Sequence, residues 1–318
     1  MLKAVVTGGA GFIGSSLCEV LVLKGWDVIA YDNMSVGRRK NLSSLNKTRR
    51  GKFNLVSGDC TRIEKLSQII RDCDAVFHFA ANPEVRMELN NPSQCFRQNV
   101  YATYCALEAF ATSNAKRFIF ASTSAVYGDA KLRPTPEDYA PMEPISIYAG
   151  SKLAGEALVS SYCHTFNKQG IVLRFANVLG PRSTHGVVRD FVTRLVEKPR
   201  ELRILGDGQQ VKSYTYIDDC TRAIMVSLQA SKSPVEVFNV GSEDQISAKE
   251  IGRTVIEAMG LKNVKFKLAG GLSDGRGWVG DVKNMLLDIS RLKTRGWTPT
   301  HDSRESVRLT VQALMARR

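Results

Sequence analysis

The sequence lacks a long apolar run, a paired-cysteine motif and a histidine cluster, and each gap excludes a class of protein. No stretch is apolar over the roughly 20 residues that a membrane-spanning helix needs, and Leu2–Thr7 is too short for the core of a signal peptide. The seven cysteines contain no C-x-x-C pair, so neither a zinc site nor a disulfide framework is indicated. His78 and His185 are interpreted as structural. We expect a soluble, cytoplasmic protein without a metal, its cysteines mostly buried as small hydrophobic residues.

Positive charge is abundant but unevenly spread. The net charge is +13, and more than half of it comes from one stretch of seven basic residues without an acidic one: Arg38, Arg39, Lys40, Lys47, Arg49, Arg50 and Lys52. A basic patch can bind nucleic acid, but no aromatic side chain interrupts this run to stack on bases. We interpret the stretch as a solvated loop, and nucleic-acid binding is the alternative.

The first half alternates short apolar runs with amphipathic segments, which is the pattern of a parallel sheet covered by helices. The expected strands are Leu2–Thr7, Asp27–Tyr31, Phe53–Val56, Ala75–Phe79, Arg117–Ala121 and Ile171–Phe175, with Glu236–Val240 returning to the same sheet. The expected helices include Phe12–Lys24, Ser93–Ser113 and Ile147–Asn167.

Beyond Phe175 the elements become shorter and are separated by loops rich in glycine and proline, as in a lobe that closes over a ligand. The predicted fold class is α/β: a Rossmann-type, doubly wound parallel sheet with a smaller α/β C-terminal lobe. The first domain is expected to cover 1–175, with a strand and helix around 215–241 returning to it. The second lobe then comprises 176–214 and 242–318.

A glycine motif follows the first expected strand and opens the first expected helix: Gly8, Gly11 and Gly14 give G-x-x-G-x-x-G. Such glycines let the backbone turn tightly and approach a pyrophosphate at the helix N-terminus. Asp32 ends the second strand, where a carboxylate accepts a hydrogen bond from a ribose 2′-hydroxyl and repels a 2′-phosphate. NAD is therefore favoured over NADP, although Arg38 and the arginine after it lie close enough in sequence to pair with a phosphate.

A tyrosine and a lysine stand one helical turn apart in Tyr148-Ala-Gly-Ser-Lys152. A lysine ammonium near a phenol favours the phenolate, which can act as a general base near neutral pH. The spacing is common by chance, and a surface pair is the ordinary interpretation. It gains weight because Ser122-Thr123-Ser124 ends the fifth strand, and strand carboxyl ends face the ligand crevice of a doubly wound sheet.

Taken in order, the motifs resemble an extended short-chain dehydrogenase/reductase of the sugar-nucleotide epimerase and dehydratase family. The resemblance runs nearly end to end through Gly8–Gly14, Asp32-Asn33, Gly58-Asp59, His78–Ala81, Gln98–Val100, Ser122–Gly128, Tyr148-x-x-x-Lys152 and Arg174–Pro181. Within the family, UDP-glucose 4-epimerases are the most similar group.

The resemblance implies roles residue by residue. NAD would contact Gly8, Gly11, Phe12, Ile13, Gly14, Asp32, Asn33, Asp59, Cys60, Phe79, Ala80, Ala81, Asn99, Ala121, Tyr148, Lys152 and Phe175. The UDP-sugar would contact Ser122, Thr123, Ser124, Tyr148, Asn177, Val187, Val188, Lys212, Arg276, Asp281 and Met285. Tyr148, Lys152 and Thr123 would be catalytic. The resemblance also implies a homodimer, in which Ser93–Ser113 and Ile147–Asn167 form a four-helix bundle with a second copy.

The two residues after Thr123 favour one branch of the family. The dehydratases have Asp-Glu there, because eliminating water needs an acid and a base at neighbouring carbons, and the decarboxylases have a glutamate at the second position. This chain has Ser124-Ala125. The simplest supported chemistry is epimerisation at C4, with UDP-glucose and UDP-galactose as the default pair. Tyr148 would take the 4-hydroxyl proton, assisted by Thr123, while hydride passes to NAD and later returns to the other face.

Other functions remain open. An epimerase of N-acetylated or uronic UDP-sugars and another nucleotide-sugar reductase use the same residues. A non-catalytic, dinucleotide-binding or RNA-associated protein would keep the fold without the chemistry, but it would have no need of Thr123, Tyr148 and Lys152.

The second lobe departs from the family pattern in two places, and a third position bears on the sugar pocket. Lys212 replaces an arginine that faces the diphosphate, and an exposed surface lysine is an equally good interpretation. Trp278 stands where an arginine often does, which weakens Arg276 as a phosphate contact and leaves Asp281 as a candidate for a ribose hydroxyl. Met285 stands where the family places one wall of the sugar pocket, but an apolar residue there fits a core equally well.

Overall fold

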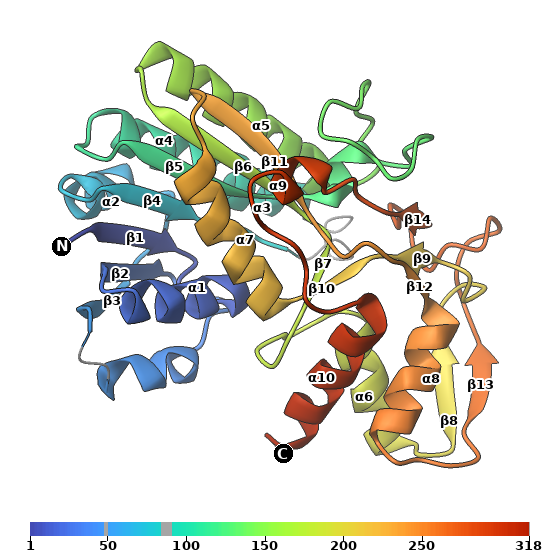
Figure 1. Ribbon diagram of the computed structural model, residues 1–318. Coiled ribbons are helices and arrows are strands. Elements are labelled where there is room, and N and C mark those ends of the chain that lie inside the picture. Colours follow the sequence, from blue (N-terminus) through green and yellow to red (C-terminus); the bar gives the residue numbers. More distant parts are fainter. Residues whose placement is uncertain (48–49, 84–90, 318) are drawn as a thin grey trace. The chain divides into compact units, whose positions relative to one another are not determined.

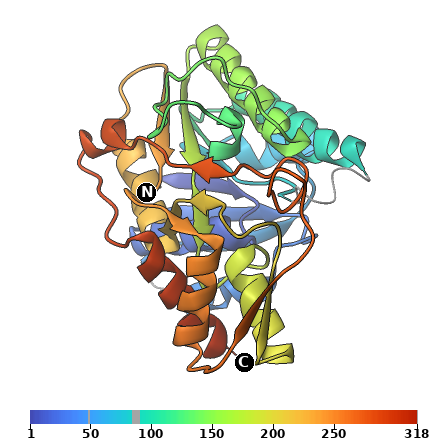
Figure 2. The ribbon, with the colours of Figure 1, turned by 90° about the vertical axis from the view of Figure 1, so that its right-hand side faces the viewer.

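The computed structural model describes residues 1–47, 50–83 and 91–317, without the side chains of Asn46 and Lys47. The chain forms two compact units, and each is discontinuous in sequence (Figure 1; Figure 2). The first unit comprises Met1–Val126, Ile147–Arg174 and Ile224–Phe238. The second comprises Tyr127–Ser146, Phe175–Ala223 and Asn239–Arg318.

The first unit is built on a parallel sheet, which has seven strands in the described residues, in the order β11-β6-β5-β4-β1-β2-β3. The strands are β1 (Lys3–Thr7), β2 (Asp27–Asp32), β3 (Phe53–Ser57), β4 (Ala75–His78), β5 (Arg117–Thr123), β6 (Gln169–Phe175) and β11 (Val235–Val240). The order reverses at β1, and ligands of such sheets bind outside the strand carboxyl ends at that switch point. The predicted Rossmann-type fold is confirmed.

Helices cover both faces of this sheet, which is why the central strands are mainly apolar, and every residue of β4 is buried. The helix α2 packs on α4, and α4 packs on α5; α1 and α7 lie together on the other face (Figure 1). The helices are α1 (Phe12–Leu23), α2 (Ile63–Ile70), α3 (Pro92–Cys95), α4 (Ala102–Ala111), α5 (Ile147–Thr165) and α7 (Ile217–Ala230), with 3-10 helices η1 (Arg39–Lys47) and η3 (Ser124–Tyr127).

The expected helix Ser93–Ser113 is interrupted. It consists of α3, a π-helical segment η2 (Phe96–Tyr101) and α4. The hydrophobic period does not reveal such a change of pitch. Asn99 lies within η2 and is 2% exposed, and π-helical turns often occur at functional sites.

The buried residues include the polar and sulfur groups that the sequence assigned to the core. All seven cysteines are buried and free, as predicted. His78 is fully buried, with Nδ1 2.8 Å from Thr7 Oγ1 and Nε2 3.1 Å from Thr103 Oγ1. Burial lowers the pKa of His78 to about 3, so the ring is neutral. Its predicted structural role is confirmed.

The second unit is assembled from short strands and three helices that pack on one another. The strands are β7 (Asn177–Leu179), β8 (Glu201–Ile204), β9 (Val211–Lys212), β10 (Tyr214–Tyr216), β12 (Ile246–Ser247), β13 (Lys265–Leu268) and β14 (Asn284–Met285). The helices α6 (Val187–Glu197), α8 (Ala248–Ala258) and α10 (Ser303–Met315) pack on one another, and α9 (Ser290–Lys293) is a single turn. A capping box of Ser247 and Glu250 begins α8.

The segment Tyr127–Ser146 lies in the second unit, whereas the sequence placed it within the first domain. Its hydrogen-bond partners explain the difference: Thr135 N donates to Leu286 O at 2.8 Å, and Asp288 N donates to Thr135 O at 2.9 Å. The Tyr127 hydroxyl also donates to Asn239 Oδ1 at 2.8 Å. These partners are more than a hundred residues away, where no local pattern reveals them.

Candidate active site

The loop between β1 and α1 has room only for glycine at two of its three predicted positions. Gly8 has a φ of +67°, and a Cβ there would lie 2.7 Å from Ala80 N. A Cβ on Gly14 would lie 2.2 Å from Gly8 O. The N-cap residue Gly11 provides no capping side chain, and the first turn of α1 has no acidic residue. This helix N-terminus therefore suits an anion such as a pyrophosphate.

Asp32 ends β2 with its carboxylate fixed beside this loop. The carboxylate accepts hydrogen bonds from Ala10 N at 2.9 Å and from Met34 N at 2.8 Å, and the residue is 6% exposed. A Cβ on Gly37 would lie 2.7 Å from Asp32 Oδ1. The chain after β2 thus folds closely around a negative charge, which suits a ribose hydroxyl better than a second phosphate.

Two further candidates for cofactor binding are held by hydrogen bonds within the first unit. Asp59 Oδ1 accepts from Thr61 N at 2.8 Å and from Thr61 Oγ1 at 2.9 Å. Partial burial raises the pKa of Asp59, but the hydrogen bonds outweigh it and hold the pKa below its usual value. Asn99 Nδ2 donates to Ser151 Oγ at 2.9 Å, and Ser151 Oγ donates to Tyr148 O at 2.7 Å. Asn99 is therefore tied to the first turn of α5.

The predicted catalytic residues come from the end of β5 and the start of α5. Thr123 is the last residue of β5, and Tyr148 and Lys152 occupy successive turns of α5. Lys152 is 3% exposed, and its Nζ donates to Ala121 O at 2.8 Å. Burial lowers the pKa of Lys152 to about 8, although Cys95 and Glu156 oppose the shift. The interpretation as a surface pair is wrong for Lys152, since its ammonium lies inside the protein.

The structure reveals an ion pair behind these residues that the sequence analysis missed. Ser122, predicted at the substrate, directs its hydroxyl to the buried Glu156, which also binds Arg174. Glu156 follows Lys152 by four residues, and Arg174 begins one of the matching motifs. A search for charges at helical spacing from Lys152 would have found the glutamate.

In the second unit Lys212 forms an ion pair and is mostly buried. Its Nζ lies 2.6 Å from Asp281 Oδ1 and 5.6 Å from the centroid of the Trp278 ring, and the side chain is 16% exposed. The interpretation of Lys212 as an exposed surface residue is therefore wrong. Asn177 Nδ2 donates to the carbonyl oxygen of Ser213, which follows Lys212 in the sequence, at 3.2 Å. The structure thus brings Asn177, Lys212 and Asp281 into one neighbourhood.

The other predicted substrate contacts of this unit also have partners within the unit. Arg276 binds Asp274 Oδ2 and Asp129 Oδ2, both at 2.6 Å, and donates to Asp281 O at 2.9 Å. Met285 pairs in register with Lys212 across β14 and β9 and is 7% exposed, which agrees with the core interpretation. Val187 and Val188 begin α6, with Val188 buried.

Comparison with known proteins identifies the family. Residues 4–241 match the model of the NAD dependent epimerase/dehydratase family. The chain belongs to this family. A UDP-glucose 4-epimerase of Mycolicibacterium smegmatis is 30% identical, with 98% of both chains covered.

Two solved structures resemble this family member over essentially its whole length. A UDP-galactose 4-epimerase is 37% identical, with a TM-score of 0.88 and 99% of both chains covered. A tyrosine-to-phenylalanine mutant of UDP-glucuronic acid 4-epimerase from Bacillus cereus, in complex with UDP-4-deoxy-4-fluoro-glucuronic acid and NAD, is 30% identical, with a TM-score of 0.90 and full coverage of both chains. The protein is an NAD-dependent isomerase of the nucleotide-sugar epimerase type.

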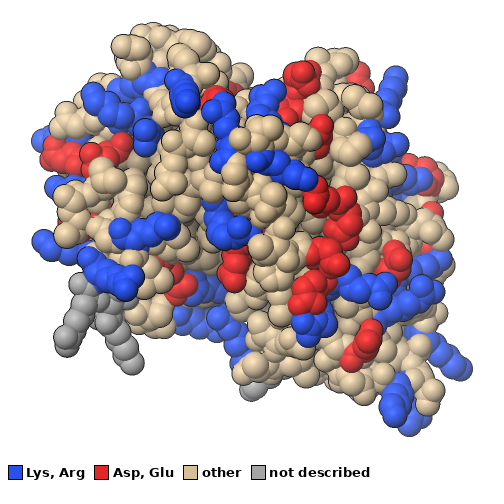
Figure 3. Space-filling model, viewed as in Figure 1, with Lys and Arg blue, Asp and Glu red and all other residues tan. Residues whose placement is uncertain are grey.

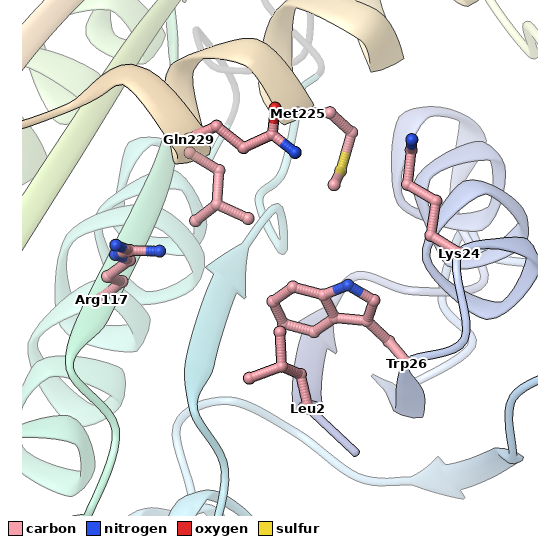
Figure 4. Close-up of a pocket in the computed structure, with 7 residues that line it drawn as sticks. Leu2, Lys24, Trp26, Arg117, Met225 and Gln229 are labelled. Atoms are coloured by element: carbon pink, nitrogen blue, oxygen red, sulfur yellow. The ribbon is translucent and has the colours of Figure 1, made fainter.

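One pocket of this epimerase-family protein lies away from all the predicted site residues. It has a volume of about 380 Å³ and lies in the first unit, between α1, α7 and the sheet (Figure 4). Leu2 precedes β1, Trp26 precedes β2 and Arg117 begins β5, so the pocket is at the amino ends of the strands. The other lining residues are Lys24, Met225, Leu228 and Gln229. It is therefore at the opposite end of the sheet from the crevice that binds ligands in such folds.

The basic stretch is exposed where it is described. The residues Arg38, Arg39, Lys40, Arg50 and Lys52 are exposed, Arg49 lies outside the described residues, and the side chain of Lys47 is not described. Acidic and basic side chains are interspersed over the face in Figure 3. Residues 39–47 of the stretch form the 3-10 helix η1 and not a loop, whereas the exposure of the described basic side chains agrees with the expected contact with solvent.

Two classes of feature are absent from the part of the chain that the structure describes. It contains no cluster of three or more His, Cys, Asp or Glu side chains that could hold a metal ion. It also contains no helix with the length and apolarity to cross a bilayer.

Proposed function

We propose that this enzyme interconverts UDP-glucose and UDP-galactose by epimerisation at C4. The proposal rests on which catalytic residues the chain has. The residues for oxidation at C4 are present, namely Thr123, Tyr148 and Lys152, but Ser124 and Ala125 follow the threonine where an acid and a base for removal of water would stand. Removal of water at neighbouring carbons needs a further acid and base, and these two positions supply neither. The likeness to UDP-glucose and UDP-galactose 4-epimerases supports the same choice.

The residues of the first unit suit NAD. The glycine loop and the N-terminus of α1 would hold its pyrophosphate, Asp32 its adenosine ribose, and Asp59 and Asn99 would lie along the rest of it. When bound, NAD accepts hydride from C4 of the sugar and gives it back.

The protein moves the proton. The Tyr148 phenolate takes the proton of the 4-hydroxyl and returns it, and the Thr123 hydroxyl links the two oxygens by hydrogen bonds. The Lys152 ammonium, buried on the same face of α5, stabilises the phenolate. Because its pKa is about 8, Lys152 remains mainly charged at neutral pH.

The second unit would bind the nucleotide diphosphate. Lys212 supplies a point charge for a phosphate oxygen, and Asn177 and Asp281 supply an amide and a carboxylate for the diphosphate and the ribose. Lys212 and Asp281 bind each other at 2.6 Å, so substrate must share or exchange these partners. Arg276 is the weaker candidate, because two carboxylates already bind its guanidinium.

A second substrate class has a specific observation in its favour. A UDP-glucuronic acid 4-epimerase is 30% identical, the same identity as the UDP-glucose 4-epimerase of Mycolicibacterium smegmatis. A UDP-N-acetylglucosamine 4-epimerase is 27% identical. We therefore include N-acetylated and uronic UDP-sugars as alternative substrates.

Exposed aromatic side chains support a homodimer. Phe96 is 60% exposed, Tyr101 42%, Tyr104 39% and Phe166 47%, and they lie on or next to the helices that were expected to pair with a second copy. Large exposed apolar groups that gather on one face commonly mark an interface. Analytical ultracentrifugation tests this, and a monomer that persists at high protein concentration contradicts it.

One experiment tests the function. The purified protein is incubated with UDP-glucose, UDP-N-acetylglucosamine and UDP-glucuronic acid, and C4 epimers are detected by NMR. Formation of UDP-galactose supports the proposal, and Tyr148→Phe should slow it strongly. If only the N-acetylated or the uronic sugar is converted, the enzyme is a 4-epimerase of that sugar and the choice of UDP-glucose is wrong. A 6-deoxy-4-keto product contradicts epimerisation.

A further inference from the structure

A buried ion pair joins the catalytic helix to two strands of the sheet. Arg174 Nε donates to Glu156 Oε1 at 3.0 Å, and a second guanidinium nitrogen lies 2.6 Å from Oε2. Their side chains are 4% and 8% exposed. The Ser122 hydroxyl also donates to Glu156 Oε1. The carboxylate of α5 therefore binds β5 through Ser122 and β6 through Arg174.

Buried ion pairs rarely add net stability, because the cost of removing two charges from water offsets their attraction. Apolar residues of similar volume often give equal or greater stability in such positions. The contacts of this pair point instead to what it fixes in place.

The pair fixes α5 at the point where the catalytic residues need to be aligned. Glu156 lies one turn after Lys152 and two turns after Tyr148, so all three share one helix face. The adjacent Gly155 brings the helix backbone against the sheet, since a Cβ there would lie 2.5 Å from Phe120 Cζ. On β5, Ser122 directly precedes Thr123. A shift of the carboxylate would thus displace both halves of the catalytic set.

The same carboxylate acts on the charge of Lys152. Besides Tyr148 one turn earlier on α5, the titratable groups that act on Lys152 are Cys95 on α3, Glu156 on α5 and His78 on β4. His78 is neutral, so it contributes no charge near pH 7. Burial lowers the pKa of Lys152, and Cys95 and then Glu156 oppose that shift.

We propose that Glu156, held by Arg174, is the positioning residue of the catalytic helix: it sets the place of Tyr148 relative to Thr123 and holds a carboxylate one turn from Lys152. The proposal rests on the proposed function in that it assumes proton transfer by Tyr148. It does not depend on which UDP-sugar is the substrate.

Two variants separate the effect of the charge of Glu156 from the effect of the length of its side chain. Glu156→Gln keeps the length and removes the charge, whereas Glu156→Asp keeps the charge and shortens the side chain. Exposed Glu257→Gln is the matched control, since it removes a carboxylate far along the sequence on α8. Rates are measured per bound NAD, so loss of folded protein does not affect them, with whichever UDP-sugar the wild type epimerises.

In Glu156→Gln, we expect the alkaline limit of kcat/KM to move down by about one pH unit, the order of effect of a nearby charge. In Glu156→Asp, we expect the limit to stay while kcat falls about 10- to 100-fold, because a misplacement of about 1 Å can cost that much. KM should change little in both. A role in stability alone predicts lower thermal stability with an unchanged pH limit and an unchanged rate per bound NAD, and that result overturns the proposal.

A single substitution that leaves one buried charge alone can prevent folding. The double variant Glu156→Gln with Arg174→Gln removes both charges and retains amide groups that can bind each other. It should fold, retain NAD and show a reduced kcat at unchanged KM. Wild-type kcat in this double variant overturns the proposal. If UDP-glucose is not epimerised but another UDP-sugar is, the proposed function fails while this test still applies.

Discussion

The two units differ in how their functional residues are held. In the first unit, the candidates lie at the ends of strands of four to seven residues in one continuous sheet, or on α1, η2 and α5. In the second, β9, β12 and β14 have two residues each, and the charged candidates are already in ion pairs: Lys212 binds Asp281, and Arg276 binds Asp274 and Asp129. The first unit presents its groups on a rigid frame, whereas the second unit has ion pairs that a ligand must rearrange.

The two units also differ in how far their functional residues match the family pattern. By the resemblance found in the sequence, the first unit follows the family pattern at the reactive residues, and the second departs from it at Lys212 and Trp278. We therefore expect substitutions in the first unit to change turnover or cofactor identity, with KM little altered. Substitutions in the second unit should change KM or the preference among sugars.

The largest effect is expected at the base. Tyr148→Phe should lower kcat by about 10²–10⁴-fold, because general-base catalysis contributes that much, while NAD stays bound and KM changes little. A coupled galactose-to-glucose assay measures kcat and KM, and the NAD content of the purified protein shows whether the cofactor stays bound. Tyr139→Phe, which removes a hydroxyl that accepts from Lys131 N, is the control. Wild-type turnover in Tyr148→Phe contradicts the mechanism.

Cofactor identity should depend on Asp32. The wild-type protein should release NAD and no NADP on denaturation, because a 2′-phosphate would meet the fixed carboxylate and like charges in contact cost several kcal/mol. Asp32→Asn should raise the share of NADP, and exposed Asp72→Asn should not. Chromatography of the released nucleotides measures this. Mainly NADP in the wild type would mean that Arg38 or Arg39 dominates the pocket.

A smaller change is expected from the second unit. Lys212→Met should raise KM for the UDP-sugar by roughly 10- to 100-fold, since hydrogen bonds to charged groups contribute about 1.5–3 kcal/mol, with kcat less affected. Lys212→Arg should bind at least as well as the wild type. The control is Lys293→Met, which breaks the exposed pair with Glu243 in the same unit. A fall in kcat at constant KM in Lys212→Met would remove the contrast between the units.

The smallest effect is expected at Met285. Met285→Tyr should remove activity on N-acetylated UDP-sugars and largely spare UDP-glucose, a shift in selectivity of about 1–3 kcal/mol. Met285→Leu, which conserves volume, should leave the ratio of the two kcat/KM values unchanged. If Met285→Tyr folds and also leaves that ratio unchanged, Met285 is only a core residue.

The sequence predicted the sheet of the first unit closely. Asp27–Tyr31 was expected where β2 runs from Asp27 to Asp32, and Phe12–Lys24 where α1 ends at Leu23. Apolar runs, helical periods and glycine turns are local patterns, and the neighbours that cause them are close in sequence. The π-helical segment around Asn99 was missed, because it changes the pitch of a helix without changing its apolar face.

What the sequence determined by itself is the Rossmann-type sheet, the glycine loop and the spacing of Tyr148 and Lys152, all properties of short segments. The tertiary structure decided which charges meet. It paired Glu156 with Arg174, placed Lys212 against Asp281, 69 residues away, and moved Tyr127–Ser146 into the second unit. Such partners are chosen when distant segments pack together, since an ion in the interior must find an opposite charge wherever the fold provides one. Neither propensity nor periodicity carries that information.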